Sequence, residues 1–393
     1  MLDFPNYEFS TLTLCLAIAM GGIVLFELLH YIFVLGKIVF YKSESSDKDN
    51  TISEDDESKG VSVVVVVNNN ASALQEELVM FLEQNYPLFE VVVVNENSKD
   101  DTEFILHILQ ENYKNLKVVP LGQNANKFSD RKFSLSIGIR SAKYNTIVLT
   151  DITCKIRDFN WLRALCEPFV NSGKKILVGY SKPEYKKGLL NILARYYYLN
   201  RSMDVLGYGL IGLPFSADSN NMGYDKDFFF QKGGFISQYR KNCRQEDYFI
   251  SRYANRKNTM INLNSQSFVS SPYIETYKTF KRKAYAGYIS QKTYSFFTKF
   301  RLALLPLATL LLYLGLALLI LLGMPWQFVV LPVLIKWVLQ TIYYNKCSKK
   351  LQTKIPSLLV PFLEIYFMFF NFNMRIKSLF YRKKTYKIRW KNK

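Results

Sequence analysis

The sequence predicts an α/β domain built on a doubly wound parallel sheet and flanked on both sides by membrane-spanning helices. Two short β-branched runs, residues 61–67 and 89–94, have the composition of buried parallel strands. Amphipathic helical stretches alternate with strands over about ninety residues, which is typical of this fold class. Long apolar stretches before and after the domain predict the membrane helices.

The first element is the apolar stretch 12–36, which is long enough to span a bilayer. Because no Lys or Arg precedes it, a signal peptide is not expected. Lys37 and Lys42 follow it, which predicts an external N-terminus. Glu27 and His30 share one helical face, and we expect them to contact other spans or to lie near an end of the helix. Residues 1–40 are therefore predicted to be a transmembrane helix.

Residues 41–60 hold seven acidic residues and little that is apolar, which predicts a disordered linker. The sheet domain follows, over residues 61–290. We predict strands at 61–67, 89–94, 116–119 and 146–150, and helices at 73–84, 101–113 and 131–142. Ligands of such sheets bind at the carboxyl ends of the strands, so the site is expected just after Val67, Val94 and Thr150.

The second apolar block occupies residues 291–373. We predict spans at 303–323 and 326–344, joined by an uncharged loop that can lie outside. The stretch 355–373 contains Pro356, Pro361 and Glu364 and has basic segments on both sides, which favours a re-entrant or interfacial segment. Residues 374–393 carry nine Lys or Arg and no acid, and are predicted to be a cytoplasmic tail.

The charge of the chain points to membrane rather than to nucleic acid. The 393 residues carry a net charge of +19, but the basic tail directly follows an apolar stretch and no nucleic-acid-binding motif accompanies it. We therefore expect contact with anionic lipid and no nucleic-acid partner. The five cysteines lie far apart, and only two histidines are present, so neither a disulfide framework nor His-based chemistry is expected.

Polar side chains follow three of the predicted strands. Asn68, Asn69 and Asn70 follow the first, Asn95 and Glu96 the second, and Asp151 the fourth. A nucleoside diphosphate needs polar groups for its base and ribose, and a hard cation held by carboxylate for its phosphates. Mg²⁺ and Mn²⁺ prefer such oxygen ligands.

Residues 61–102 resemble the opening of the inverting family 2 glycosyltransferases, which have the GT-A fold. The match continues at Lys132, at Leu149–Cys154 with its D-x-D-like stretch, at Ser219–Met222 followed by Gly233-Gly234-Phe235, and at Gln245-Glu246-Asp247. It covers about residues 60–290, and apolar spans are also common in membrane-bound members.

The resemblance implies a nucleotide-sugar (UDP- or GDP-linked) donor, a lipid-linked or polysaccharide acceptor, and Mg²⁺ or Mn²⁺ as cofactor. It implies an enzyme of the inner membrane with a cytoplasmic catalytic domain. It also implies residue roles: Asn69, Asn95, Glu96, Lys132 and Asp151 for the nucleotide sugar, Asp151 and Thr153 for the metal, Asn221, Met222 and Gly234 for the acceptor side, and Glu246 with Asp247 for catalysis, Asp247 being the base.

Three positions depart from the family pattern. Thr153 replaces the second aspartate of D-x-D, Asn95 replaces the first of two paired aspartates, and Lys281–Tyr285 stands where Q-x-x-R-W is expected. These departures leave a second hypothesis open, namely a catalytically degenerate protein that binds a nucleotide or acts as a scaffold.

Two further segments have alternative interpretations. Gly207–Gly212 reads G-x-G-x-x-G, but a helical stretch precedes it and Leu213-Pro214 follows, so we predict a flexible loop near the acceptor entrance rather than a dinucleotide site. Residues 273–300 mix basic and aromatic side chains just before a span, which predicts an interfacial helix.

Overall fold

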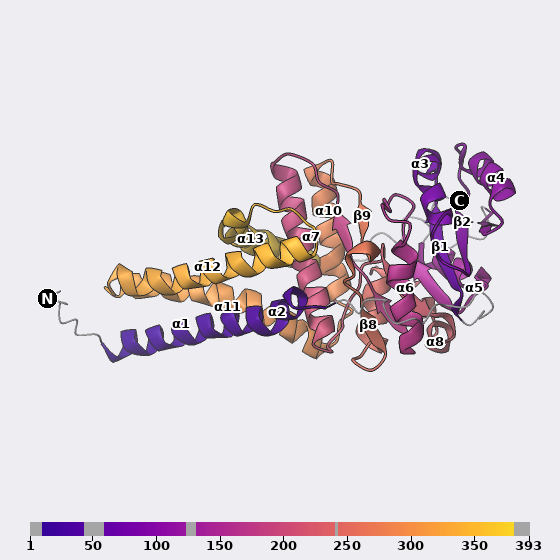
Figure 1. Ribbon diagram of the computed structural model, residues 1–393. Coiled ribbons are helices and arrows are strands. Elements are labelled where there is room, and N and C mark those ends of the chain that lie inside the picture. Colours follow the sequence, from indigo (N-terminus) through magenta and orange to yellow (C-terminus); the bar gives the residue numbers. More distant parts are fainter. Residues whose placement is uncertain (1–9, 43–58, 123–130, 240–242, 381–393) are drawn as a thin grey trace.

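The computed structural model describes residues 10–42, 59–122, 131–239 and 243–380. A sheet domain forms one end of the molecule, three long helices project together from the other end, and two helices stand between these parts (Figure 1). The predicted linker and the last part of the basic tail lie almost entirely outside the described residues.

The first half of the domain has the predicted alternation. Its elements are β1 (Val61–Val67), α3 (Ala71–Leu82), β2 (Phe89–Asn95), α4 (Thr102–Asn112), β3 (Leu116–Pro120), α5 (Arg131–Ser141) and β4 (Thr146–Leu149). β1 pairs in parallel with both β2 and β4, and β2 pairs in parallel with β3.

Strand β1 is buried along its whole length because both faces of the sheet are covered. Val64 and Val66 point into a core shared with α5, whereas Val61, Val63 and Val65 point into a second core with α3 and α6 (Trp161–Ser172). Successive side chains of a strand alternate between faces, so a fully apolar run satisfies both cores.

The second half completes a seven-stranded sheet of order β3-β2-β1-β4-β7-β5-β8. β7 (Met222–Asp225) is antiparallel to its neighbours β4 and β5 (Ile176–Val178), and β8 (Thr259–Ile261) is parallel to β5. The remaining elements are β6 (Ser181–Pro183) paired with β9 (Val269–Ser271), α8 (Lys226–Gln231) and α9 (Gln245–Tyr253), with short 3-10 turns at Ile236–Gln238 and Ser265–Ser267.

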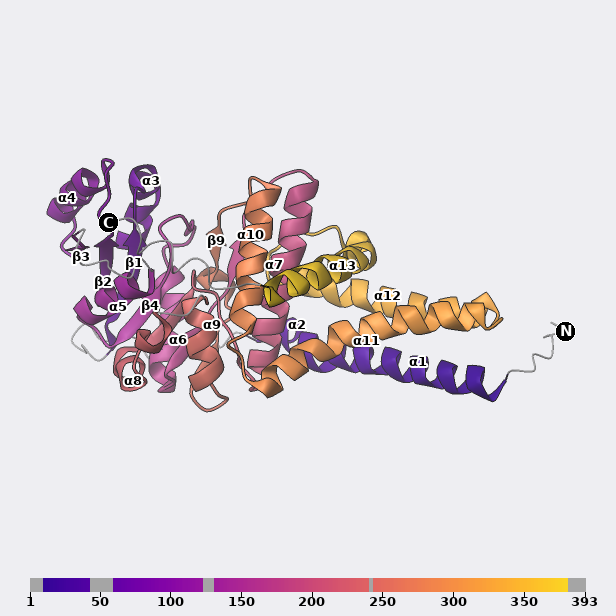
Figure 2. The ribbon, with the colours of Figure 1, turned by 180° about the vertical axis from the view of Figure 1, so that it is seen from behind.

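Two helices connect this domain to the apolar helices. α7 (Leu189–Leu210) and α10 (Tyr277–Gln291) stand between the sheet and the projecting bundle in both ribbon views (Figures 1 and 2). The predicted interfacial segment 273–300 thus forms α10 and the start of the next helix. Phe280, Ala284 and Tyr288 of α10 are buried, so this helix is packed into the protein along one side.

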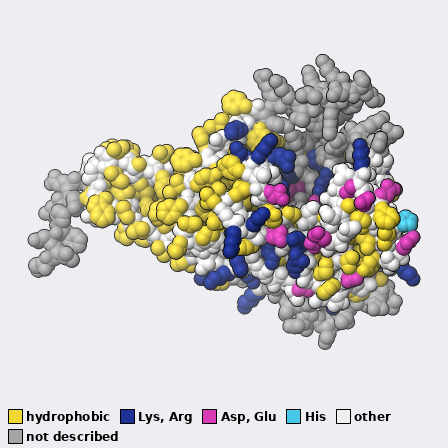
Figure 3. Space-filling view, turned by 90° about the horizontal axis from the view of Figure 1, so that it is seen from above, with side chains coloured by type: hydrophobic (Ala, Val, Ile, Leu, Met, Phe, Trp, Pro, Cys, Tyr) yellow, Lys and Arg dark blue, Asp and Glu magenta, His cyan; other side chains and the backbone are white. Residues whose placement is uncertain are grey.

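The projecting bundle contains α1 (Thr11–His30), which continues through a π-turn (Tyr31–Leu35) into α2 (Gly36–Val39), together with α11 (Phe296–Leu321) and α12 (Trp326–Lys350). On the face shown in Figure 3, hydrophobic side chains cover much of the bundle, and Lys and Arg side chains begin where it meets the globular part. Exposed apolar surface of this extent marks a contact with lipid or protein. Among the described residues, four helices are long and apolar enough to cross a membrane.

The fourth of these helices, α13 (Val360–Leu379, preceded by a 3-10 turn at Ser357–Leu359), occupies a different position. It lies at the end of the bundle nearest the domain (Figures 1 and 2) and packs against α10, α12 and α7. The Tyr277 and Tyr366 hydroxyls, for example, are 3.0 Å apart. This placement is compatible with the predicted interfacial segment, which stays a prediction. The helix also takes in Arg375 and Lys377 of the predicted tail.

A buried charge cluster joins the apolar helices. Lys336 of α12 is fully buried, and its Nζ lies 2.9 Å from Glu27 of α1 and 3.0 Å from Glu364 of α13. The Thr309 hydroxyl of α11 donates to Glu27, and Gln340 donates to Glu364. Glu27 therefore contacts other spans, as expected from the sequence, and Lys336 is shared between the two carboxylates.

The prediction of a flexible loop at Gly207–Gly212 is wrong. Helix α7 runs through Leu210, so Gly207 and Gly209 are helical. A Cβ on Gly207 would lie 2.7 Å from Val34, and one on Gly209 would lie 2.5 Å from Ile261. The glycines are therefore explained by close packing of α7 against the π-turn segment and β8, and not by backbone freedom.

Candidate active site

The tips of β1 and β2 are joined by a network of side-chain and backbone hydrogen bonds. Asn69 adopts a left-handed conformation (φ 53°), and its Oδ1 accepts from the backbone N–H of Lys99 at 2.8 Å. Asn95 Oδ1 accepts from the Ser98 hydroxyl at 2.6 Å, and Glu96 accepts from the Ser134 hydroxyl. Asn69, Asn95 and Glu96 thus lie together at one edge of the sheet, as predicted, while also shaping its two loops.

Asp151 lies two residues beyond β4. In the strand order, β1 and β4 are the neighbours at which the chain reverses its direction across the sheet, which is where open α/β sheets bind ligands. Asp151 Oδ2 forms an ion pair with Arg131 at 2.7 Å, and its Oδ1 accepts from the Thr153 hydroxyl at 2.7 Å. Burial opposes ionisation of this carboxyl, but Arg131 and the Thr153 hydrogen bonds outweigh burial and hold its pKa below the ordinary value.

A cavity of about 380 Å³ connects this strand tip to α7 and α10, the helices next to the apolar bundle. Asp151, Thr153 and Arg131 line one part of it, and Arg201, Arg244 and Glu246 line another. Cofactor-sized pockets have volumes of this order. The structure therefore brings the candidate metal ligands and one of the two candidate catalytic carboxylates to a single cavity.

The two carboxylates at the start of α9 have different surroundings. Glu246 lines the cavity, and its Oε2 has no hydrogen-bond partner among the described residues. Asp247 is 0% exposed. Its Oδ1 accepts from Arg201 Nη2 at 3.0 Å, from the Tyr294 hydroxyl at 2.8 Å and from the Ser216 hydroxyl.

These surroundings shift the pKa values of Glu246 and Asp247 in opposite directions. Burial, and then the negative charge of Asp247, raise the pKa of Glu246 to about 7. Burial also opposes ionisation of Asp247, but Arg201, Arg244 and its hydroxyl donors prevail and hold its pKa below the ordinary value. Of the two groups, Glu246 has the acidity that suits a general base near neutral pH.

Asn69, Asn95, Glu96 and Asp247 lie outside the lining of this cavity as far as the described residues define it, and so do four other predicted residues. Asn221 is fully buried and donates to the backbone carbonyls of Tyr180 and Ser267 at 2.9 and 2.7 Å. Met222 is the first residue of β7, Gly234 is in a left-handed turn against Phe229, and the Lys132 Nζ donates to the Gln238 carbonyl at 3.4 Å. Asp218, Ser219 and Asn220, just before Asn221, do line the cavity.

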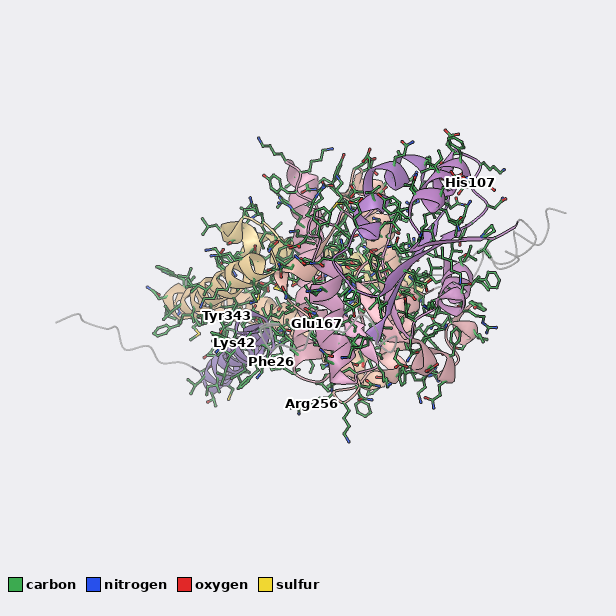
Figure 4. The ribbon with its side chains drawn as sticks, turned by 45° about the vertical axis from the view of Figure 1, so that its right-hand side comes forward. Phe26, Lys42, His107, Glu167, Arg256 and Tyr343 are labelled. Atoms are coloured by element: carbon green, nitrogen blue, oxygen red, sulfur yellow. The ribbon has the colours of Figure 1, made fainter. Side chains whose placement is uncertain are left out.

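Sequence reasoning missed the basic residues of the site. Arg131 directly precedes Lys132, and Arg244 directly precedes Gln245-Glu246-Asp247, so adjacency to the motifs is a signal that points to both. Arg201 lies in the middle of a helix and has no such signal. His107 lies on the outer edge of the sheet domain, far from the bundle (Figure 4).

Comparison with known proteins finds a family model that matches part of the chain. Residues 62–202 match the family model "Glycosyl transferase family 2". Among solved structures, the mannosyltransferase PcManGT from Pyrobaculum calidifontis in complex with GDP-Man and Mn²⁺ is similar at 15% identity and a TM-score of 0.50, covering 86% of this chain and 99% of that chain. S. aureus TarS 1–349 gives 13% identity and a TM-score of 0.41 over 60% of this chain and 70% of that chain. None of the curated proteins compared with the chain matches it.

The domain has the GT-A fold, and its residues 62–202 match the family 2 glycosyltransferases. The protein is a glycosyltransferase with flanking helices apolar enough to cross a membrane.

The described residues of this site offer few protein ligands for a divalent cation. No group of three or more His, Cys, Asp or Glu side chains that could hold a metal occurs in the part of the chain that the structure describes. Mg²⁺, however, is commonly bound by one or two carboxylates together with substrate phosphates. Asp151 meets this requirement once Arg131 moves from its carboxylate, and the Thr153 hydroxyl lies beside it.

Proposed function

We propose that this protein is a membrane-anchored inverting glycosyltransferase that moves a sugar from a UDP- or GDP-linked donor to a lipid-linked or polysaccharide acceptor at the cytoplasmic face of the inner membrane. The observation that carries the proposal is the single cavity shared by Asp151 at the strand tip and Glu246 at the start of α9. The first group suits a donor diphosphate and the second suits a proton acceptor.

The reaction is a single displacement. The acceptor oxygen forms a bond to the anomeric carbon while the bond between that carbon and the donor diphosphate oxygen breaks. The hydroxyl proton passes to a carboxylate of the Glu246–Asp247 pair, and the nucleoside diphosphate leaves. A divalent cation held by Asp151 and Thr153 would stabilise the charge of the leaving diphosphate.

Within the pair, the geometry favours Glu246 as the group that takes the proton. Glu246 lines the cavity and has no hydrogen-bond partner at Oε2, whereas Asp247 does not line it and accepts three hydrogen bonds at Oδ1, although its Oδ2 is also without a partner among the described residues. Asp247 then acts as a positioning residue that holds Arg201 and sets the charge beside Glu246. The role of Asp247 as the base, implied by the family resemblance, is the alternative.

We expect the acid limb of the pH profile to have an apparent pKa of about 7. A base must be ionised, so kcat/KM should rise tenfold per pH unit below this value and level off above it. The charged groups around Glu246 are Asp247, Arg244 and Arg201, with Lys283 lining the same cavity. Initial rates between pH 5 and 9 test this, and a limb near pH 4 would exclude Glu246 as the base.

The proposed orientation of the protein in the membrane predicts on which side reporters at two positions will lie. A reporter fused after Lys393 should read as cytoplasmic, and one inserted between Gly323 and Trp326, in the α11–α12 loop, should read as external. A paired alkaline phosphatase and fluorescent protein fusion distinguishes the two sides. An external reading at Lys393 would contradict both the tail assignment and the interfacial placement of α13.

Donor binding tests the proposal at its first step. UDP and GDP should each be titrated into the purified full-length protein in detergent, with and without Mg²⁺ or Mn²⁺. We expect one of them to bind with metal-dependent affinity, and Asp151→Asn to weaken it at least tenfold, while Asp227→Asn on exposed helix α8 leaves it unchanged. If neither nucleotide binds, the proposed donor class is wrong.

A further inference from the structure

Three polar side chains, two from α7 and one from the start of α9, converge beside the catalytic pair. An added Cβ on Gly287 of α10 would lie 3.3 Å from Arg244 Nη2, 3.5 Å from the Tyr197 hydroxyl and 3.7 Å from Arg201 Nη1. Arg201 and Tyr197 are one turn apart on α7, and Arg244 directly precedes α9. The absent side chain of Gly287 therefore leaves room for these groups to meet, and we call Arg201, Arg244, Tyr197 and Gly287 the guanidinium cradle.

In the part of the chain that the structure describes, one of the two guanidiniums of the cradle forms an ion pair at hydrogen-bond distance, and the other does not. Asp247 pairs with one nitrogen of Arg201, while Arg244 Nη2 donates to the backbone carbonyl of Lys283 at 3.2 Å and has no carboxylate within ion-pair distance among the described residues. The Lys283 side chain adds a third cation to the same cavity. Two guanidiniums and a phenol hydroxyl form a donor set that suits phosphate.

The cradle also lies next to the apolar helices rather than at the strand tips. The Tyr197 ring packs against Phe367 and Phe370 of α13, with centroids 6.0 and 6.5 Å apart. The same helix α10 that supplies Gly287 contacts α13 again through the Tyr285 hydroxyl, which donates to the Lys377 carbonyl. A phosphate bound here would thus sit on the membrane side of the cavity, whereas the donor diphosphate is expected at Asp151.

We propose that the guanidinium cradle binds a phosphate group of the acceptor, and that the acceptor is a lipid phosphate whose attached sugar presents the reacting hydroxyl to Glu246. This inference rests on the proposed function and narrows its acceptor to the lipid-linked class. Bound at the cradle, the phosphate fixes the hydroxyl beside the carboxylate that takes its proton, so recognition and orientation come from the same contacts.

The test uses the full-length protein in detergent and three probes, namely farnesyl phosphate, farnesol and inorganic phosphate. We expect farnesyl phosphate to bind, and both other probes to bind at least tenfold more weakly. Arg244→Gln and Gly287→Ala should each weaken farnesyl phosphate at least tenfold. Alanine is a good helix former, so Gly287→Ala fills the cradle without disturbing α10. Arg282→Gln, an exposed position on the same helix, is the matched control and should change nothing.

UDP and GDP binding to the same variants separates this inference from the proposed function. We expect nucleotide affinity to stay within twofold in Arg244→Gln and Gly287→Ala. A parallel loss of nucleotide affinity would mean that the cradle holds the donor diphosphate, and equal binding of inorganic phosphate would mean that no lipid is recognised. Either result overturns the inference. A wild-type protein that binds farnesyl phosphate but neither nucleotide would instead contradict the proposed function alone.

Discussion

Replacing Glu246 with Gln should lower kcat of sugar transfer by a factor of about 10² to 10⁴, because the amide cannot accept the acceptor proton. Donor affinity should stay unchanged, since the donor diphosphate is expected at Asp151, at another part of the cavity. The measurement is a steady-state rate with donor and acceptor varied separately. A fall in donor affinity with unchanged kcat would assign Glu246 to binding instead.

The variant Asp247→Asn distinguishes the two candidate bases. If Glu246 takes the proton, loss of the Asp247 charge removes the repulsion that raises the Glu246 pKa, so the acid limb should move to lower pH. The same variant should lower kcat through misplacement of Arg201, which Asp247 holds at 3.0 Å. An activity loss as large as that of Glu246→Gln, with no displaced acid limb, would favour Asp247 as the base.

The second large effect is a loss of stability, which is expected from a change in the bundle of apolar helices. Lys336→Met should lower the free energy of unfolding by about 3–5 kcal/mol, because Glu27 and Glu364 would lose the buried cation that each of them contacts. Denaturant titration of the protein in mixed micelles measures this quantity. The matched control is Lys346→Met on the exposed side of the same helix, where a change within about 0.5 kcal/mol is expected.

Neutralising the partners should restore part of this stability. The triple variant Glu27→Gln, Lys336→Met and Glu364→Gln removes all three charges, so its stability should exceed that of Lys336→Met alone. If Lys336→Met lowers the free energy of unfolding by less than about 1 kcal/mol, the buried charge cluster does not hold the four apolar helices together.

Much of the fold could be predicted because its signals are local. The valine-rich strand at 61–67 and its neighbours predict a sheet covered on both faces, and the structure places β1 to β4 within a few residues of the predicted ranges. Helix α7 is a case in which local sequence signals predict the wrong structure. Glycine at 207 and 209 suggests a loop, but contacts with Val34 and Ile261, far away in the sequence, keep the segment helical.

The residues of the candidate site likewise divide into those that the sequence could predict and those that it could not. Asp151 could be placed from the sequence because topology brings strand tips together. Glu246, at the start of α9, could be placed only through its motif Gln245-Glu246-Asp247. The guanidinium cradle could not, since Tyr197, Arg244 and Gly287 meet only through the packing of α7, α9 and α10. Asn221 shows the converse case, because a motif position can serve loop geometry through hydrogen bonds to Tyr180 and Ser267.

The most direct test of the central claim is release of nucleoside diphosphate from a panel of UDP- and GDP-sugars by the purified full-length protein. The assay should contain Mg²⁺ or Mn²⁺ and a membrane lipid extract as acceptor source, with Glu246→Gln as the control. We expect one donor to be turned over and the control to lose this activity. Donor binding without release from any sugar in the presence of acceptor would contradict catalysis and favour the nucleotide-binding scaffold.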